Sequence, residues 1–202
     1  LFTPTAGVEE PVNVVTVGTA WSDEAGNPPV GSTDSANYAI DTLAPSVILS
    51  SPTANPTNGL IAVTAEFSET VTGFDDTDIS IVNGTVESFV AVDGNTYTFD
   101  VNPTDGASVA VTIDVLAAVA DDIAGNDNTA SNQLSYTSDT VPPTVAIGLG
   151  DDALKIGDTS LLTFTFSEEP TDFTVADIAA PNGALSGFTV TGNPLVYEAL
   201  FT

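Results

Sequence analysis

Residues 109–115 have the sequence Val-Ala-Val-Thr-Ile-Asp-Val, in which apolar residues occupy every second position. Successive side chains of a β-strand point to opposite faces, so this alternation predicts a strand with one face in a core and the other toward solvent. The chain is rich in Thr, Val and Ile, and its 16 Gly and 13 Pro supply turns. The composition therefore favours an all-β protein.

Six further strand patterns flank this segment, and turn dipeptides such as Asn-Gly at 83–84 and Asp-Gly at 93–94 lie between them. These predicted strands cover residues 47–49, 61–67, 79–82, 86–92, 97–101 and 134–136. Seven short strands in about 98 residues predict an immunoglobulin-like β-sandwich. The side chains expected to be buried on its facing sheets are Phe67, Tyr97, Phe99, Val111 and Ile113.

The chain repeats itself with a period of about 99 residues. Residues 41–47 read DTLAPSV and residues 139–145 read DTVPPTV, while Phe-Ser-Glu occurs at 67–69 and again at 166–168. Other residues that recur at this spacing are Phe74 and Phe173, Asp78-Ile79 and Asp177-Ile178, Asn83-Gly84 and Asn182-Gly183, and Phe89 and Phe188. The sequence therefore predicts tandem domains.

The first 40 residues match the second half of a repeat. Pro-Thr-Ala-Gly at 4–7 corresponds to Pro-Thr-Asp-Gly at 103–106, and Asp23 with Ala-Gly-Asn at 25–27 corresponds to Asp122 with Ala-Gly-Asn at 124–126. We therefore interpret residues 1–40 as the C-terminal part of an Ig-like domain, residues 41–138 as a complete domain, and residues 139–202 as the N-terminal part of another.

The two partial copies fit together in sequence. Residues 1–3 and residues 200–202 both read Leu-Phe-Thr, so joining residue 199 to residue 1 rebuilds a whole domain. This predicts a native unit of 199 residues, in which residues 139–202 of one unit pack with residues 1–40 of the next.

The charged residues exclude most catalytic chemistry. The chain carries 28 Asp and Glu against one basic residue, Lys155, and it has no His and no Cys. It therefore lacks a side chain that titrates near neutrality, a thiolate nucleophile and a basic surface for nucleic acid. A net charge of −27 would also repel anionic lipid and attract divalent cations. We expect an extracellular or cell-surface setting, no nucleic-acid partner, and no membrane insertion in this segment.

The recurring motifs resemble those of the bacterial Ig-like repeats of very long secreted adhesins and surface proteins. They are D-T-x-x-P-x-V in the linker, F-S-E, a following F with D-I, N-G, and D-x-A-G-N before the last strand. The resemblance covers the whole chain when the two partial copies are counted, although Pro28-Pro29 makes the last loop of the split copy different. It implies tandem domains that act as extender segments and are often stiffened by calcium.

Four acidic positions recur in both copies. The pairs are Asp41 and Asp139, Glu69 and Glu168, Asp78 and Asp177, and Asp122 and Asp23. In a sandwich of this topology the loops that carry them meet at the pole where the linker enters. Carboxylates that lie so close repel one another, and calcium, which takes roughly 6 to 8 oxygen ligands, is a natural neutraliser. We predict a calcium site at each junction; the alternative is that these are ordinary solvated loop acids.

Other candidates for chemistry have less support. The pairs Asp75-Asp76 and Asp151-Asp152 could suggest glycoside hydrolysis, but neither recurs in the other copy. Trp21 could stack on a sugar, yet its counterpart in the full copy is Ala120. The sequence therefore predicts a protein that is not an enzyme.

Two functions remain. The first is a structural extender segment of a tandem Ig-like array in an extracellular surface adhesin or fibre, with neighbouring copies arranged head to tail. The alternative is a subunit of an extracellular filament that assembles when subunits complete each other's split Ig-like domains.

Overall fold

A computed structural model describes residues 2–202, so Leu1 of the terminal Leu-Phe-Thr match lies outside the described residues. The chain divides into two compact units, one that ends at Thr140 and one that runs from Val141 to Thr202. Among the described residues, regular structure consists of strands and two short 3₁₀ helices. The all-β prediction is confirmed.

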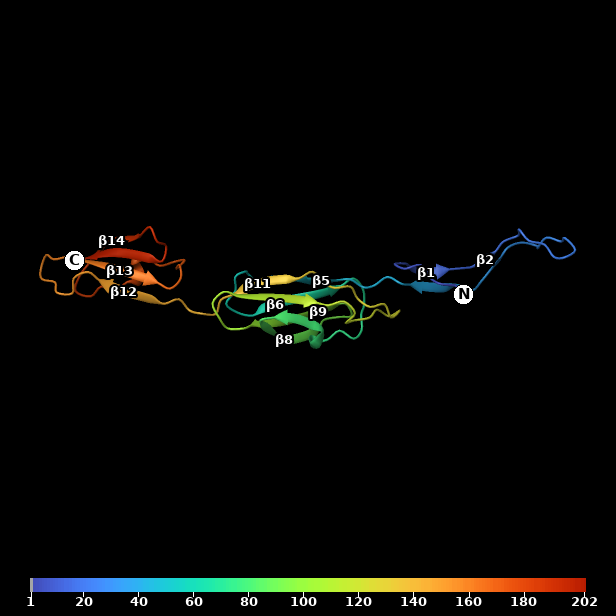
Figure 1. The fold of residues 1–202 in the computed structure, drawn as a ribbon, viewed down its shortest axis with the longest axis horizontal. Helices are drawn as coiled ribbons and strands as arrows, with labels where there is room; N and C mark the ends of the chain where they lie inside the picture. The colour runs from blue at the N-terminus through green and yellow to red at the C-terminus, as the bar shows by residue number, and fades with distance from the viewer. Residues whose placement is uncertain (1) are drawn as a thin grey trace. The chain divides into compact units, whose positions relative to one another are not determined.

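Seven strands between residues 41 and 138 form two antiparallel sheets (Figure 1). One sheet has the order β5-β6-β9-β8 and the other has the order β11-β10-β7. The strands are β5 (Val47–Ser50), β6 (Ile61–Phe67), β7 (Ile79–Val82), β8 (Gly84–Ala91), β9 (Thr96–Pro103), β10 (Val109–Val115) and β11 (Leu134–Ser138). Each lies where the sequence pattern predicts a strand.

The core of this sandwich lies between the two sheets. Its large side chains come from alternate positions of β5, β6, β9 and β10, as the period of a strand requires. The five predicted core residues, Phe67, Tyr97, Phe99, Val111 and Ile113, are all buried in one cluster. The predicted strand register is therefore confirmed.

The Asn-Gly pair marks the point where the chain crosses from one sheet to the other. Asn83 has a φ of 59°, which Asn tolerates better than most residues, and its side-chain amide donates to the carbonyl of Ala110 at 2.8 Å. A Cβ on Gly84 would lie 3.0 Å from the side chain of Val101, so a larger residue would be crowded at this crossing. Asn182 has a φ of 64° at the repeated position.

The segment between β5 and β6 contacts the last strand of the domain. The amide of Thr57 donates to the carbonyl of Thr137 at 3.0 Å, and the amide of Asp139 donates to the carbonyl of Thr57 at 2.9 Å. Asn55 adds two bonds: its side chain donates to Ser135 at 3.1 Å and accepts from Thr137 at 2.9 Å. This contact, the terminal clamp, joins the first and last parts of the domain in parallel orientation.

The N-terminal segment is built from two short antiparallel pairs. Strand β1 (Glu9–Asn13) pairs with β4 (Tyr38–Asp41), and β2 (Thr16–Val17) pairs with β3 (Thr33–Asp34). The amide of Val15 donates to Ser35 Oγ at 3.0 Å and the amide of Ser35 donates to Val15 at 2.9 Å. In the intact sandwich, Val115 and Ser131 make the same two bonds, at 2.9 and 3.0 Å.

The second unit contains a single four-stranded sheet of order β12-β13-β15-β14. Its strands are β12 (Val145–Leu149), β13 (Ser160–Phe166), β14 (Leu185–Val190) and β15 (Val196–Phe201). The order matches β5-β6-β9-β8, and the 3₁₀ helix Val175–Asp177 repeats the helix Asp76–Asp78. Residues 178–181, which correspond to β7, do not form a strand. In the intact sandwich β7 pairs with β10, and no such partner stands beside residues 178–181 in their own unit.

Candidate metal centre

Three carboxylates meet where the linker enters the intact sandwich. Asp41 ends strand β4, Glu69 follows β6 by two residues, and Asp122 lies in the loop between β10 and β11. One oxygen from each lies within 4.8 Å of one oxygen from each of the others. We call this group the junction triad. It unites three of the four acids that the sequence predicts for this pole.

Asp122 is the most buried member, with 3% of its surface exposed. Its Oδ1 accepts the backbone amide of Asn126 at 2.9 Å, and its Oδ2 accepts the Asn126 side-chain amide at 2.7 Å. Burial opposes ionisation, but these bonds from Asn126, with further backbone bonds from Gly125 and Ala124, outweigh it and lower the pKa of Asp122. The carboxylate is therefore held charged in a fixed orientation.

Asn126 also ties the linker to this loop. Its side-chain amide donates to the backbone carbonyl of Asp41 at 3.3 Å and to Asp41 Oδ1 at 3.4 Å. Asp41 Oδ1 in turn accepts the backbone amide of Leu43 at 3.1 Å. The last residue of β4 is thereby positioned by the same asparagine that orients Asp122.

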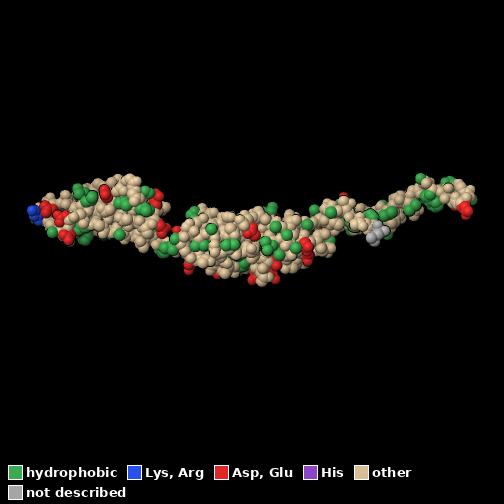
Figure 2. Space-filling model, in the orientation of Figure 1, with side chains coloured by type: hydrophobic (Ala, Val, Ile, Leu, Met, Phe, Trp, Pro, Cys, Tyr) green, Lys and Arg blue, Asp and Glu red, His purple; other side chains and the backbone are tan. Residues whose placement is uncertain are grey.

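Glu69 experiences the repulsion that this arrangement creates. Burial raises the pKa of Glu69, and the charges of Asp122, Asp41 and Glu9 raise it further. Glu9 lies on β1, so the N-terminal segment contributes to the field at the junction. Figure 2 shows that acidic side chains are spread over the visible face of the molecule, whereas the junction triad concentrates three of them within one small volume.

The donor set of the junction triad suits a hard divalent cation. It offers carboxylate oxygens, with the carbonyl of Asp41 nearby, and no nitrogen or sulfur ligand. Calcium accepts oxygen ligands in loose geometry and can complete its shell with water. The group can therefore hold a metal ion, and a bound cation would offset the repulsion that raises the pKa of Glu69.

Asp78 is not a member of the junction triad. It closes a capping box on the 3₁₀ helix, because its Oδ2 accepts the backbone amide of Asp75 at 2.8 Å while Asp75 accepts the amide of Thr77 at 2.8 Å. Asp177 does the same at the repeated helix, where it accepts the amide of Thr174 at 2.8 Å. The spacing of three residues between cap and acid could have indicated this role from sequence.

The second predicted set is divided between the two units. Asp23 accepts the amide and side chain of Asn27 at 2.8 and 2.9 Å, which reproduces the turn of Asp122 and Asn126. Asp139 follows β11 in the first unit, while Glu168 follows β13 in the second. A second metal site made from these residues and Asp177 stays a prediction.

The structure also places the residues considered for enzymatic chemistry. Asp75 caps a helix, and Asp151 accepts the amide of Ala153 at 3.1 Å in an ordinary turn. Trp21 is exposed on the N-terminal segment. The sequence analysis did not identify Asn126 or Glu9 as parts of the junction. Asn126 is the last residue of the recurring D-x-A-G-N motif, and this recurrence could have indicated its role. Glu9 gives no such signal, because the equivalent residue in the full copy is Ser108.

Comparison with protein families gives two adjacent matches. The family model described as bacterial Ig-like domain matches residues 41–138 and again residues 139–202. No curated protein matches the chain. In the part of the chain that the structure describes, no helix has the length and apolar character that crossing a membrane requires.

Proposed function

We propose that this chain, which belongs to the bacterial Ig-like domain family, is an extender segment of a tandem Ig-like array in an extracellular surface adhesin or fibre, stiffened by calcium at the domain junctions. Tandem domains of this family are typical of surface proteins and are typically non-catalytic. An array of such domains would space a distal binding domain from the cell.

The convergence of Asp41, Glu69 and Asp122 supports the calcium part of the proposal most directly. Asp41 belongs to the N-terminal segment and the other two belong to the sandwich, so a cation bound by all three would tie the linker to the domain that follows it. Such a tie would restrict bending at the junction. Pro45, which is buried in the sandwich, restricts it further because its φ is fixed.

Calcium titration tests this proposal. We expect chelation with EDTA to lower the melting temperature of the full chain and to increase the spread of inter-domain geometries seen by small-angle scattering. Glu69→Gln should abolish the response to calcium. Glu66→Gln is the matched control, because Glu66 is exposed on β6 outside the junction triad and its loss should leave the response intact. Melting and scattering that are both indifferent to EDTA would remove the calcium site.

A denaturing gel of native material separates the array from the filament of subunits. An array should give one very large polypeptide, because its domains are covalently joined. Subunits that complete each other's domains should instead give a band near the 20.5 kDa of this chain.

A further inference from the structure

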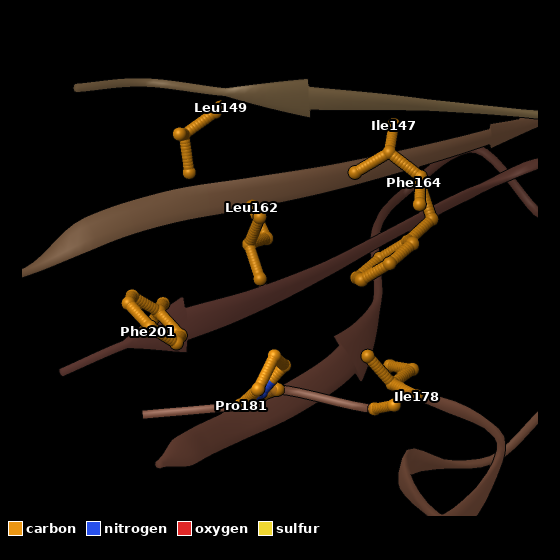
Figure 3. A pocket seen from close by; sticks show the side chains of 9 residues that line it. Ile147, Leu149, Leu162, Phe164, Ile178, Pro181 and Phe201 are labelled. Atoms are coloured by element: carbon orange, nitrogen blue, oxygen red, sulfur yellow. The ribbon is translucent and has the colours of Figure 1, made fainter. Parts of the chain in front are cut away.

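The apolar cavity of the second unit is explained by the fold. It measures about 260 Å³ and is lined by side chains that include Ile147, Phe164 and Phe201 (Figure 3). Ile147 pairs with Phe164 as Leu49 pairs with Ala65 in the intact sandwich, so the cavity lies where the intact copy has its core. It therefore needs no ligand to account for it.

The chain also contains three Asn-Gly pairs, at 58–59, 83–84 and 182–183. In such a pair the backbone nitrogen of glycine can attack the side-chain carbonyl of asparagine, because glycine has no Cβ to hinder the approach. The attack closes a succinimide ring and releases ammonia, and water then opens the ring to aspartate or isoaspartate. The asparagine side chain and the glycine amide must be free to meet, so the fold decides which pair reacts.

Asn83 is held away from this reaction. Its side-chain amide donates to the carbonyl of Ala110 at 2.8 Å, and this bond has to break before the side chain can turn toward Gly84. Gly84 also lies at the start of β8, where pairing with β9 restricts its backbone. Asn182 repeats the left-handed conformation of Asn83, and its glycine is crowded by Phe201.

Asn58 meets no such obstacle. It is exposed in the loop between β5 and β6, and its side chain makes no hydrogen bond with any of residues 2–202. The amide of Gly59 donates to Thr57 Oγ1 at 3.2 Å rather than to a strand. A Cβ on Gly59 would meet nothing within 4 Å, so the space around the reacting atoms is open.

The same loop forms one side of the terminal clamp. Thr57, next to Asn58, donates its amide to Thr137 at 3.0 Å and accepts the amide of Asp139 at 2.9 Å. Asn58 and Asp139 line one cavity of about 310 Å³. A carboxylate formed at residue 58 would face the same cavity as the carboxylate of Asp139, and two like charges there repel each other.

We propose that Asn58 is a site of spontaneous deamidation, and that the modification loosens the terminal clamp. The Gly59 nitrogen bonds to Asn58 Cγ, the bond from Cγ to Nδ2 breaks, and Nδ2 leaves as ammonia with the proton that the Gly59 nitrogen gives up. Water then cleaves one of the two ring bonds to that nitrogen. Cleavage at Cγ leaves aspartate, whereas cleavage at the backbone carbonyl carbon leaves isoaspartate, which adds a methylene group to the main chain beside Thr57. This chemistry is independent of the extender function and of bound calcium.

Peptide mapping by mass spectrometry of the folded full chain, aged at mildly basic pH, tests the site. Asn58 should be converted roughly tenfold faster than Asn83, since a hydrogen bond that must first break is worth about one factor of ten in rate. In guanidinium chloride the two rates should converge, because both asparagines precede glycine and differ mainly in the structure around them.

Gly59→Ala is the matched variant. Gly59 lies outside the left-handed region and has room for a Cβ, so this variant should fold like the unmodified chain. The added Cβ should nevertheless hinder ring closure and slow the conversion of Asn58 several-fold, while the conversion of Asn83 is unchanged.

Hydrogen exchange measures the consequence for the terminal clamp. In the aged chain the amides of Thr57 and Asp139 should exchange several-fold faster than in the fresh chain, while the amide of Phe67, at the other end of β6, is unchanged. Asn58→Asp adds the charge without lengthening the main chain, so it should show a smaller effect.

Conversion of Asn58 that is no faster than that of Asn83 in the folded chain would overturn the site. So would a rate difference that persists in guanidinium chloride, or a Gly59→Ala variant that ages like the unmodified chain. Unchanged exchange at Thr57 and Asp139 after Asn58 has been converted would overturn the loosening of the clamp.

Discussion

The intact sandwich and the second unit have the same four-stranded sheet, yet only the intact sandwich buries it. Their aromatic clusters agree closely. Ring centroids lie 5.1 Å (Phe67–Phe74) and 4.9 Å (Phe74–Tyr97) apart in the first, and 4.8 Å (Phe166–Phe173) and 5.2 Å (Phe173–Tyr197) apart in the second. These contacts join elements within one half of a domain. The comparison teaches that half a domain can specify its own sheet, while burial of that sheet requires the other half.

The two sheets differ in where they place their large side chains. Val63 pairs with Phe99 in the intact sandwich, whereas Leu162 pairs with Ala199 in the second unit. The neighbouring position on β6 is Ala65, and its counterpart on β13 is Phe164. A large residue on β9 has thus been exchanged for a large residue on β13, which keeps the volume available to the core similar in both copies.

The largest expected effect lies at this exchanged position. Phe99→Ala should destabilise the intact sandwich by about 3 to 5 kcal/mol, because it leaves a cavity in the core between the two sheets. Chemical denaturation of the full chain measures this. Val90→Ala, at an exposed position of β8, should cost no more than about 0.5 kcal/mol. A similarly small cost for Phe99→Ala would contradict the assigned core.

The next prediction contrasts one position in the two units. Leu49→Ala should cost about 2 to 5 kcal/mol, since Leu49 is enclosed by both sheets. Ile147→Ala should cost less than about 1 kcal/mol, because its side chain is 65% exposed. Equal costs at the two positions would mean that the sheet of the second unit is enclosed as fully as that of the intact sandwich.

Calcium should also distinguish the two units. At a concentration about 100 times its dissociation constant, a cation bound by the junction triad should stabilise the intact sandwich by about 2.7 kcal/mol. Hydrogen exchange of the full chain should show added protection in β6 and β10 and none in β12 to β15. Equal protection of both regions would place the cation elsewhere.

The smallest effect concerns pH. The pKa of Glu69 is raised in the folded chain above its ordinary value of 4.5, so the folded state binds this proton more tightly than the unfolded state does. Its contribution to stability is therefore complete below pH 4.5 and is lost as the pH rises through the raised pKa. In EDTA, Glu69→Gln should flatten this part of the stability profile relative to Glu66→Gln. Identical profiles for the two variants would show that neither burial nor the neighbouring charges raise the pKa of Glu69.

Much of the fold could be predicted because its information is local. Strict alternation in segments such as 61–67 and 109–115 specified which residues face the core, and the 99-residue repeat related the copies to one another. The difference between Leu49 and Ile147 could not be predicted in this way. Both are apolar residues at the same place in a strand, and their exposure depends on a sheet that is distant in sequence.

The candidate site was predictable to the extent that its acids recur. Asp41, Glu69 and Asp122 recur and converge, but recurrence alone did not distinguish a ligand from a helix cap, as Asp78 illustrates. The contribution of Glu9 depends on how β1 lies beside the sandwich, which no pattern within a single repeat encodes. A carboxylate that caps a local turn, such as Asp78, recurs in the repeat just as a metal ligand would.

The terminal clamp has a consequence for tension along the chain. Thr57 and Asn55, near the start of the domain, are bonded to Thr137 and its neighbours, near the end, in parallel orientation. A pull on the two ends of the domain drives these segments past one another, so their hydrogen bonds are loaded in shear and must break together. Bonds that break one after another yield at much lower force. A domain under tension would thus resist at the contact that closes it.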